Sequence, residues 1–156
     1  MTSPRMSVVI LRIVNRLQSS GIKSEFQFRR TAFNSTKEKD YFINDGSFGD
    51  DVAIWLMNQL RSQGLSTSDK PGQEDFGWYF TFHVSDVEHC VVFSFQPNDP
   101  AIGNRWLGWV ERQVGFVGSI LGGRKRGILP EAVNAVETAL RSSPDIQDVS
   151  WEEDST

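Results

Sequence analysis

The chain has 156 residues, of which 38% are hydrophobic and 23% charged, and its formal net charge is −4. A chain of this size and composition buries one ordinary core. Its longest apolar run, residues 52–57, is much shorter than the ~18 residues that a transmembrane helix needs. The single cysteine, Cys90, excludes an intramolecular disulfide, and with two histidines the chain offers few ligands for a structural zinc ion. We therefore expect a cytoplasmic protein without a metal or a cofactor.

The charges are unevenly distributed along the chain. Residues 1–39 contain eight lysines and arginines and two acidic residues, whereas residues 40–156 contain eight basic and eighteen acidic residues. An acidic body of this kind repels nucleic acid. We expect no nucleic-acid partner and favour a basic protein partner instead.

The first 22 residues are predicted to form an amphipathic N-terminal helix. Pro4 suits its first turn and Gly21 its end, whereas the β-branched run at residues 8–10 favours a strand. We expect the helix to dock on the protein's own core, and we rank contact of residues 5–18 with a membrane surface below that and a role as an Arg-rich targeting peptide last. The apolar side chains that share one helical face are Met6, Val9, Ile10, Ile13, Val14 and Leu17.

The next stretch of chain is predicted to contain a strand and a helix. Alternating polar and apolar residues indicate a half-buried strand over residues 25–33, and the polar stretch 34–40 indicates a loop. Ser47 is a suitable N-cap and Gly64 a suitable stop for a helix over residues 48–63. The apolar residues of this helix fall on one face, so we expect it to cover a sheet.

The middle of the chain is predicted to form a three-stranded meander. After a flexible loop at 66–74, strict alternation over 76–84 gives the clearest strand in the sequence. A turn at 85–88 joins it to a second strand at 89–95, and the third strand follows at 105–111. The third strand carries two tryptophans on opposite faces, Trp106 and Trp109, so one of them should lie outside the core.

The C-terminal part is predicted to be helical and then extended. Pro130 and the apolar spacing that follows it indicate a helix over 130–141, and a last strand follows at 146–151. We expect a short apolar helix at 114–121 and an acidic tail at 152–156. The elements together predict an α+β fold: one domain over 23–151, a two-layer sandwich of about five mostly antiparallel strands with helices on one face.

The segment 74–79 is the leading candidate binding site. Glu74 and Asp75 lie beside a glycine and two large aromatic residues, Trp78 and Tyr79, a combination that can form a recognition edge for a partner. The competing interpretation, which we favour, is a polar loop end that enters a strand with Trp78 on its core face. A different hypothesis places a ligand-binding or hydrolytic pocket between the sheet and the 66–74 loop, with Glu74, Asp75, Tyr79 or His83 in its wall.

Other polar clusters have simpler explanations. Asp50 and Asp51 lie where carboxylates favour the start of a helix, so capping is preferred over cation binding or acid–base work for the set Asp45, Asp50 and Asp51. Ordinary turn polarity is preferred over metal binding for the set His83, Asp86, Glu88 and His89. Cys90 is expected to be a small core residue.

A compact basic loop offers the one candidate anion site. Arg124, Lys125 and Arg126 lie among glycines and can contact an anion or an acidic partner, although a solvated turn is the preferred interpretation. The sequence contains none of the nucleophile or metalloprotease motifs, which favours binding over catalysis without excluding an enzyme, and we assign no catalytic residue.

Two resemblances accompany these patterns. The run 42–51 (FINDGSFGDD), with Trp55-Leu56 and the later segment 74–78 (EDFGW), resembles a set of small bacterial proteins of uncharacterised function over roughly residues 25–151. In size, acidity and α+β organisation the chain is also similar to immunity proteins of bacterial toxin systems. Neither resemblance transfers a functional residue. We expect a protein-interaction domain, of the immunity type or forming a homodimer.

Overall fold

The computed structural model describes residues 23–75, 77–99, 103–113 and 127–152. Within these ranges no helix is long and apolar enough to span a membrane. The elements in chain order are β1 (Glu25–Arg29), α2 (Asp50–Ser62), β2 (Gly72–Glu74), β3 (Gly77–Val84), β4 (Val87–Asp99), β5 (Gly103–Arg112), α4 (Pro130–Ser142) and β6 (Gln147–Trp151).

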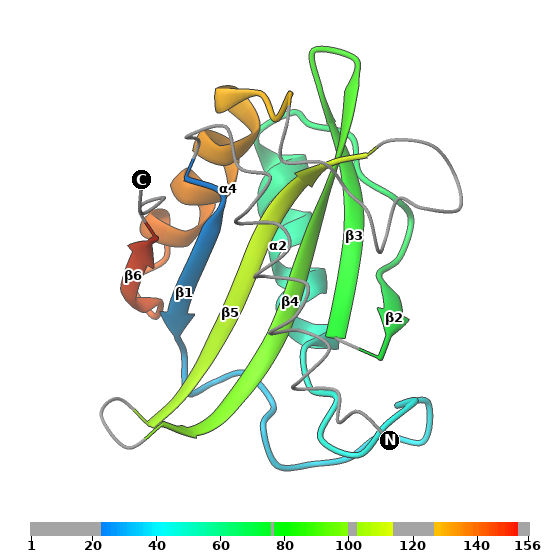
Figure 1. Cartoon of the computed structure of the whole chain (residues 1–156), viewed down its shortest axis with the longest axis vertical. Helices are drawn as coiled ribbons and strands as arrows, with labels where there is room; N and C mark the ends of the chain where they lie inside the picture. Colours follow the sequence, from blue (N-terminus) through cyan, green and yellow to red (C-terminus); the bar gives the residue numbers. More distant parts are fainter. Residues whose placement is uncertain (1–22, 76, 100–102, 114–126, 153–156) are drawn as a thin grey trace.

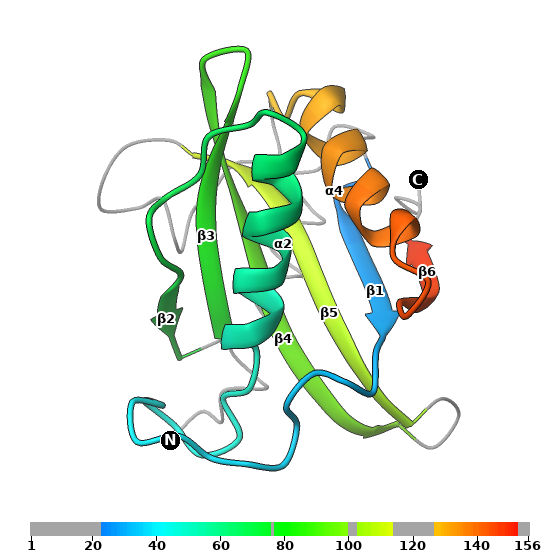
Figure 2. The same ribbon diagram turned by 180° about the vertical axis from the view of Figure 1, so that it is seen from behind.

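The strands form one antiparallel sheet in the order β2-β3-β4-β5-β1-β6. β1 therefore lies between β5 and β6, far from its neighbours in sequence. Both helices cover the same face of this sheet, side by side (Figures 1 and 2). We call this face the inner face and the opposite one the outer face. The predicted α+β class is confirmed, with six strands described instead of about five.

The main core lies between the helices and the inner face. Apolar side chains at the 3.6-residue spacing of α2 and α4 meet every second side chain of the central strands. The amide Nε2 of Gln63 also donates to the carbonyl of Ala135 at 3.0 Å, which ties the two helices together. Fully buried members of this core are Phe28, Val52, Leu56, Leu60, Phe80, Phe82, Val91, Phe93, Val110, Val136 and Leu140.

The predicted meander is confirmed by β3, β4 and β5. The turn between β3 and β4 has two residues, Ser85 and Asp86, with φ of 49° and 62°, the left-handed geometry that matches the twist of a hairpin. Trp106 and Trp109 lie on opposite faces, as predicted. Trp109 lies outside the main core but is only 1% exposed, in a small cluster on the outer face with Cys90 and Val92.

Several expected boundaries were wrong. β1 ends at Arg29, four residues before the predicted strand end. The stretch predicted as a flexible loop at 66–74 contains β2, and Thr67 forms a further bridge to Phe82, so this segment runs along the edge of β3. The N-cap of α2 is Gly49, with no side-chain cap bond, instead of Ser47.

Several expectations fall outside the described residues. These are the helices at 1–22 and 114–121, the basic loop of Arg124, Lys125 and Arg126, and residues 153–156 of the tail.

Candidate functional site

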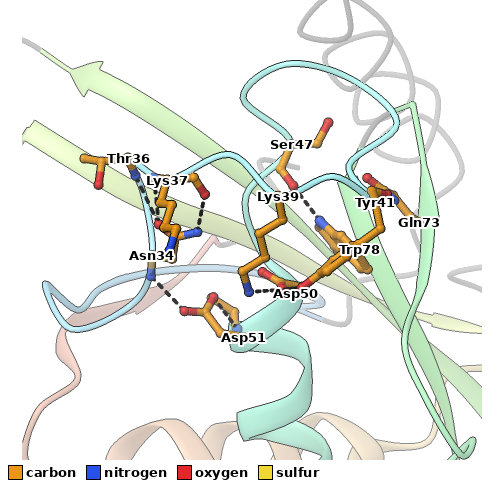
Figure 3. A network of polar contacts seen from close by, with 11 residues as sticks. Asn34, Thr36, Lys37, Lys39, Tyr41, Ser47, Asp50, Asp51, Gln73 and Trp78 are labelled. Carbon is orange, nitrogen blue, oxygen red and sulfur yellow. Dashed lines mark hydrogen bonds and ion pairs between the residues drawn. The ribbon is translucent and has the colours of Figure 1, made fainter.

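The connection from β1 to α2 is held by side chains from three other elements (Figure 3). We call residues 38–49 the clamped loop. Its fixed points are a glutamine on β2, a tryptophan on β3 and an aspartate on α2. Because these anchors belong to regular elements, they fix the loop relative to the sheet.

Gln73 of β2 binds the loop backbone at two points. Its Oε1 accepts from the N–H of Ile43 at 2.7 Å, and its Nε2 donates to the carbonyl of Tyr41 at 2.8 Å. One amide side chain thus satisfies a donor and an acceptor two residues apart, as a neighbouring strand would. Asp75 adds a long contact of 3.4 Å with the side-chain amide of Asn44.

Trp78 of β3 supports the other side of the loop. Its indole N–H donates to the carbonyl of Ser47 at 2.6 Å, and its ring packs edge-on against Tyr41 and Phe42. Gly49 passes directly over this ring with a φ of +138°, and a Cβ there would lie 3.0 Å from the indole. The glycine is therefore needed both for its backbone conformation and for space.

Asp50, in the first turn of α2, joins the helix to the loop. Its side chain is nearly fully buried, and its Oδ2 accepts from Lys39 Nζ and from the Tyr41 hydroxyl, both at 2.5 Å. Burial alone would raise the pKa of this carboxyl, but the hydrogen bonds from Lys39 and Tyr41 outweigh burial and lower it. The same contacts raise the pKa values of Lys39 and Tyr41. At neutral pH the three groups form one ion pair with a phenol hydrogen bond.

The capping role predicted for Asp50 and Asp51 is only partly correct. Both lie in the first turn of α2, where carboxylates favour the helix dipole. Neither provides the N-cap bond: Asp50 binds the loop, and Asp51 Oδ2 accepts from the backbone N–H of Asn34 at 2.7 Å. Asn34 in turn closes a local turn by accepting from the N–H of Lys37 at 2.9 Å. The two aspartates thus attach the β1–α2 connection to the helix.

The clamped loop presents large apolar side chains to solvent. Tyr41 is 57% exposed and Ile43 58% exposed, and the third large apolar residue exposed among the described ranges is Ile54 on α2, at 48%. Exposed acidic residues belong to the same loop or contact it: Glu38, Asp40, Asp45 and Asp75. Solvent-facing apolar groups on a fixed backbone, with acidic residues in the same segment, are suited to contact another macromolecule.

The structure divides the predicted site residues between two faces. Asp75 and the buried Trp78 lie at the clamped loop, and Glu74 ends β2 beside them. Tyr79 lies on the outer face against the Cys90 cluster, where burial raises the pKa of its hydroxyl. Because side chains alternate along a strand, His83 also lies on the outer face. The preferred interpretation of Trp78 as a core residue is confirmed.

The pocket hypothesis requires the 66–74 segment to cover the sheet, and the structure places this segment at the edge of the sheet. The N–H of Ser68 donates to the carbonyl of Thr81 at 2.9 Å, and β2 pairs with β3, so the 66–74 segment extends the sheet instead of covering it. Hollows of about 260 and 590 Å³ lie elsewhere, beside β1 and β6 and between β6 and α4.

The hairpin histidines do not converge. His89 is buried on the inner face against Phe82, whereas His83 is exposed on the outer face. Within the described ranges, no three His, Cys, Asp or Glu side chains are grouped so that they could hold a metal ion.

Sequence reasoning missed Lys39, Tyr41, Ile43 and Gln73 as members of one site. The run 42–51 drew attention to the loop, but the partner of Ile43 lies thirty residues later in the chain. A polar residue beside a glycine in a loop-like stretch gives no local signal of such a contact. Comparisons of the chain with protein-family models, with curated proteins and with solved structures found no match.

Proposed function

We propose that the protein is a cytoplasmic interaction domain and that the clamped loop is its contact surface for a basic protein, in the manner of an immunity-type inhibitor. The observation that carries this proposal is the exposure of Tyr41 and Ile43 on a backbone fixed by Gln73. Large side chains held in place before binding lose little conformational freedom when a partner covers them. Such residues are frequent energetic centres of interfaces.

The border of the loop indicates the charge of the partner. The exposed carboxylates of Glu38, Asp40 and Asp45 belong to the clamped loop and that of Asp75 contacts it, and the cation within the loop, Lys39, is engaged by Asp50. A complementary partner therefore carries lysines or arginines around an apolar centre. Charges at such a rim act mainly on the association rate and make it sensitive to salt.

The test uses the full chain and two matched variants. A partner is captured from the source cells, purified, and titrated against the wild type, Ile43→Ala and Ile54→Ala by calorimetry. Because Ile43 would be at the centre of the interface, its truncation should weaken binding at least about tenfold, whereas Ile54→Ala should bind within about twofold of wild type. Both residues are exposed, so neither change should alter folding.

Three results would oppose the proposal. Equal affinity of Ile43→Ala and wild type for the partner would show that the loop is not part of the interface. Binding that does not weaken between 0.05 and 0.5 M salt would rule out a partner that binds through basic residues. A wild-type dimer in sedimentation that dissociates on Ile43→Ala would make a second copy of the chain the partner.

A further inference from the structure

The outer face of the sheet carries a buried apolar patch that neither helix covers. Alternation along β3, β4 and β5 places Tyr79, Val92 and Trp109 in one row across the strands. Cys90 and Val92 have no exposed surface, and Leu107 and Trp109 are 5% and 1% exposed. Both α2 and α4 lie on the opposite face (Figures 1 and 2). A tryptophan on a bare sheet face would be solvated, so this burial requires a cover.

Two carboxylates are buried in the same patch. Glu111 has no exposed surface and its Oε1 accepts from the indole N–H of Trp109 at 2.6 Å. Glu25 is 5% exposed and lies opposite Trp109 in the β1–β5 register. Burying a carboxylate is costly unless cations or further donors accompany it. A cover for this patch should therefore be apolar along its centre and basic beside it.

We propose that residues 5–18 dock on the outer face as an amphipathic helix, with their apolar stripe on Val92 and Trp109 and their arginines toward Glu25 and Glu111. The segment has the required composition: its spacing gives one apolar face, and residues 1–22 contain three arginines and no acidic residue. It therefore complements both the apolar and the charged part of the patch.

The chain connection places this segment at the patch. The described residues begin at Lys23. The carbonyl of Ser24 accepts from the N–H of Val110, which follows Trp109 on β5. A helix over residues 5–18 is about 21 Å long, and the distance from β1 across β5 and β4 to β3 is about 14 Å. The segment is thus long enough to cover the row from Glu25 to Tyr79.

Cys90 reports on the cover, because it is the only thiol and lies within the patch. The rate at which Ellman's reagent modifies it is measured under native conditions in the full chain and its variants. Ile13→Asp places a charge in the apolar stripe and should accelerate the reaction at least about tenfold. Asn15→Asp places the same charge on the opposite side of the predicted helix and should leave the rate within about twofold of wild type.

A second measurement serves if Ile13→Asp fails to fold. In the full chain, Ile13→Cys should be cross-linked to Cys90 by dibromobimane, which bridges neighbouring thiols, whereas Asn15→Cys should not. Equal cross-linking of the two variants, or none, would overturn the proposal. The proposal would also be overturned if Ellman's reagent modified Cys90 quickly in Phe116→Asp but as slowly in Ile13→Asp as in the wild type. The cover would then be the apolar segment 114–121. The proposal would fail, too, if the wild type bound anionic phosphatidylglycerol vesicles and Cys90 became exposed on binding. Residues 5–18 would then prefer the membrane to the outer face.

Discussion

His89 couples the stability of the fold to pH in a way that one substitution can isolate. The ring has no exposed surface, and it joins β4 to the start of α4. Its Nε2 accepts from the backbone N–H of Leu129, the N-cap residue of α4, at 3.1 Å. The ring proton must therefore be on Nδ1, which donates to the carbonyl of Val87 at 3.0 Å. A second proton on Nε2 would face an N–H donor.

Burial, and to a lesser degree the charge of Arg112, lower the pKa of His89 below its ordinary value near 6.5. Between that value and the lowered one, the unfolded chain binds a proton that the folded chain does not. The free energy of unfolding therefore falls as the pH falls through this interval, by up to about 1.4 kcal/mol per pH unit. Above pH 6.5 the full contribution of the neutral ring is present.

His89→Phe keeps a ring of similar size but removes both hydrogen bonds. The N–H of Leu129 and the carbonyl of Val87 lose their partner, at about 1–3 kcal/mol for each group that stays buried. Since Val87 and Leu129 are both only half-buried, we expect the variant to be less stable than wild type by about 1–3 kcal/mol at pH 7.5. That difference should shrink as the pH falls below 6.5, because only the wild type loses stability through this ring.

Urea unfolding of both proteins at pH 7.5, 6.5, 5.5 and 5.0 measures the difference directly, and groups common to both cancel. The matched control is His83→Phe, at the exposed histidine of the same hairpin, which should change stability by less than about 0.5 kcal/mol at pH 7.5. A difference between wild type and His89→Phe that stays constant over the four pH values would refute the reasoning.

Two further substitutions test the packing at the start of β3 and at the clamped loop. Gly77→Ala puts a Cβ 1.8 Å from the carbonyl oxygen of Phe93 at a φ of +144°, so it should lower the free energy of unfolding in urea by more than about 3 kcal/mol. The control Gly64→Ala, at a left-handed glycine with free space around it, should lower it by about 1–2 kcal/mol. Similar losses of stability in the two variants would contradict the steric argument. Lys39→Met removes the cation from a buried carboxylate and should lower the free energy of unfolding by about 1.5–3 kcal/mol. The double variant Lys39→Met/Asp50→Asn should recover at least half of that loss, because it also removes the buried charge. A double variant less stable than the single one would contradict this explanation.

Local sequence patterns predicted the elements whose contacts are themselves local. The β3–β4 hairpin follows from alternation and a two-residue turn, and α4 follows from Pro130 with its apolar spacing. β2 has neither kind of signal, since Gly72–Glu74 contains no β-branched or aromatic residue. It is a strand because it pairs with β3, and Gly72 permits that pairing: a Cβ there would lie 2.3 Å from the ring of Tyr79.

The start of α2 shows how a distant contact overrides a local preference. Ser47 is a favoured N-cap residue, but its carbonyl accepts from the indole of Trp78, thirty-one residues away. The helix begins at Asp50 instead, after a glycine that passes over the same ring. For the same reason, the exposure of Tyr41 and Ile43 could not be read from residues 42–51 alone, because Gln73 fixes their orientation.

The sheet keeps the two proposed surfaces independent. Trp78 faces inward and supports the clamped loop, whereas the next residue, Tyr79, faces outward and contacts the Cys90 cluster. Adjacent residues of one strand thus serve opposite faces, and none of the loop's anchors contributes a side chain to the outer patch. A loss of partner binding in Ile43→Ala and an exposure of Cys90 in Ile13→Asp therefore report on different contacts. Either proposal can fail while the other stands, because sites without shared partners act additively.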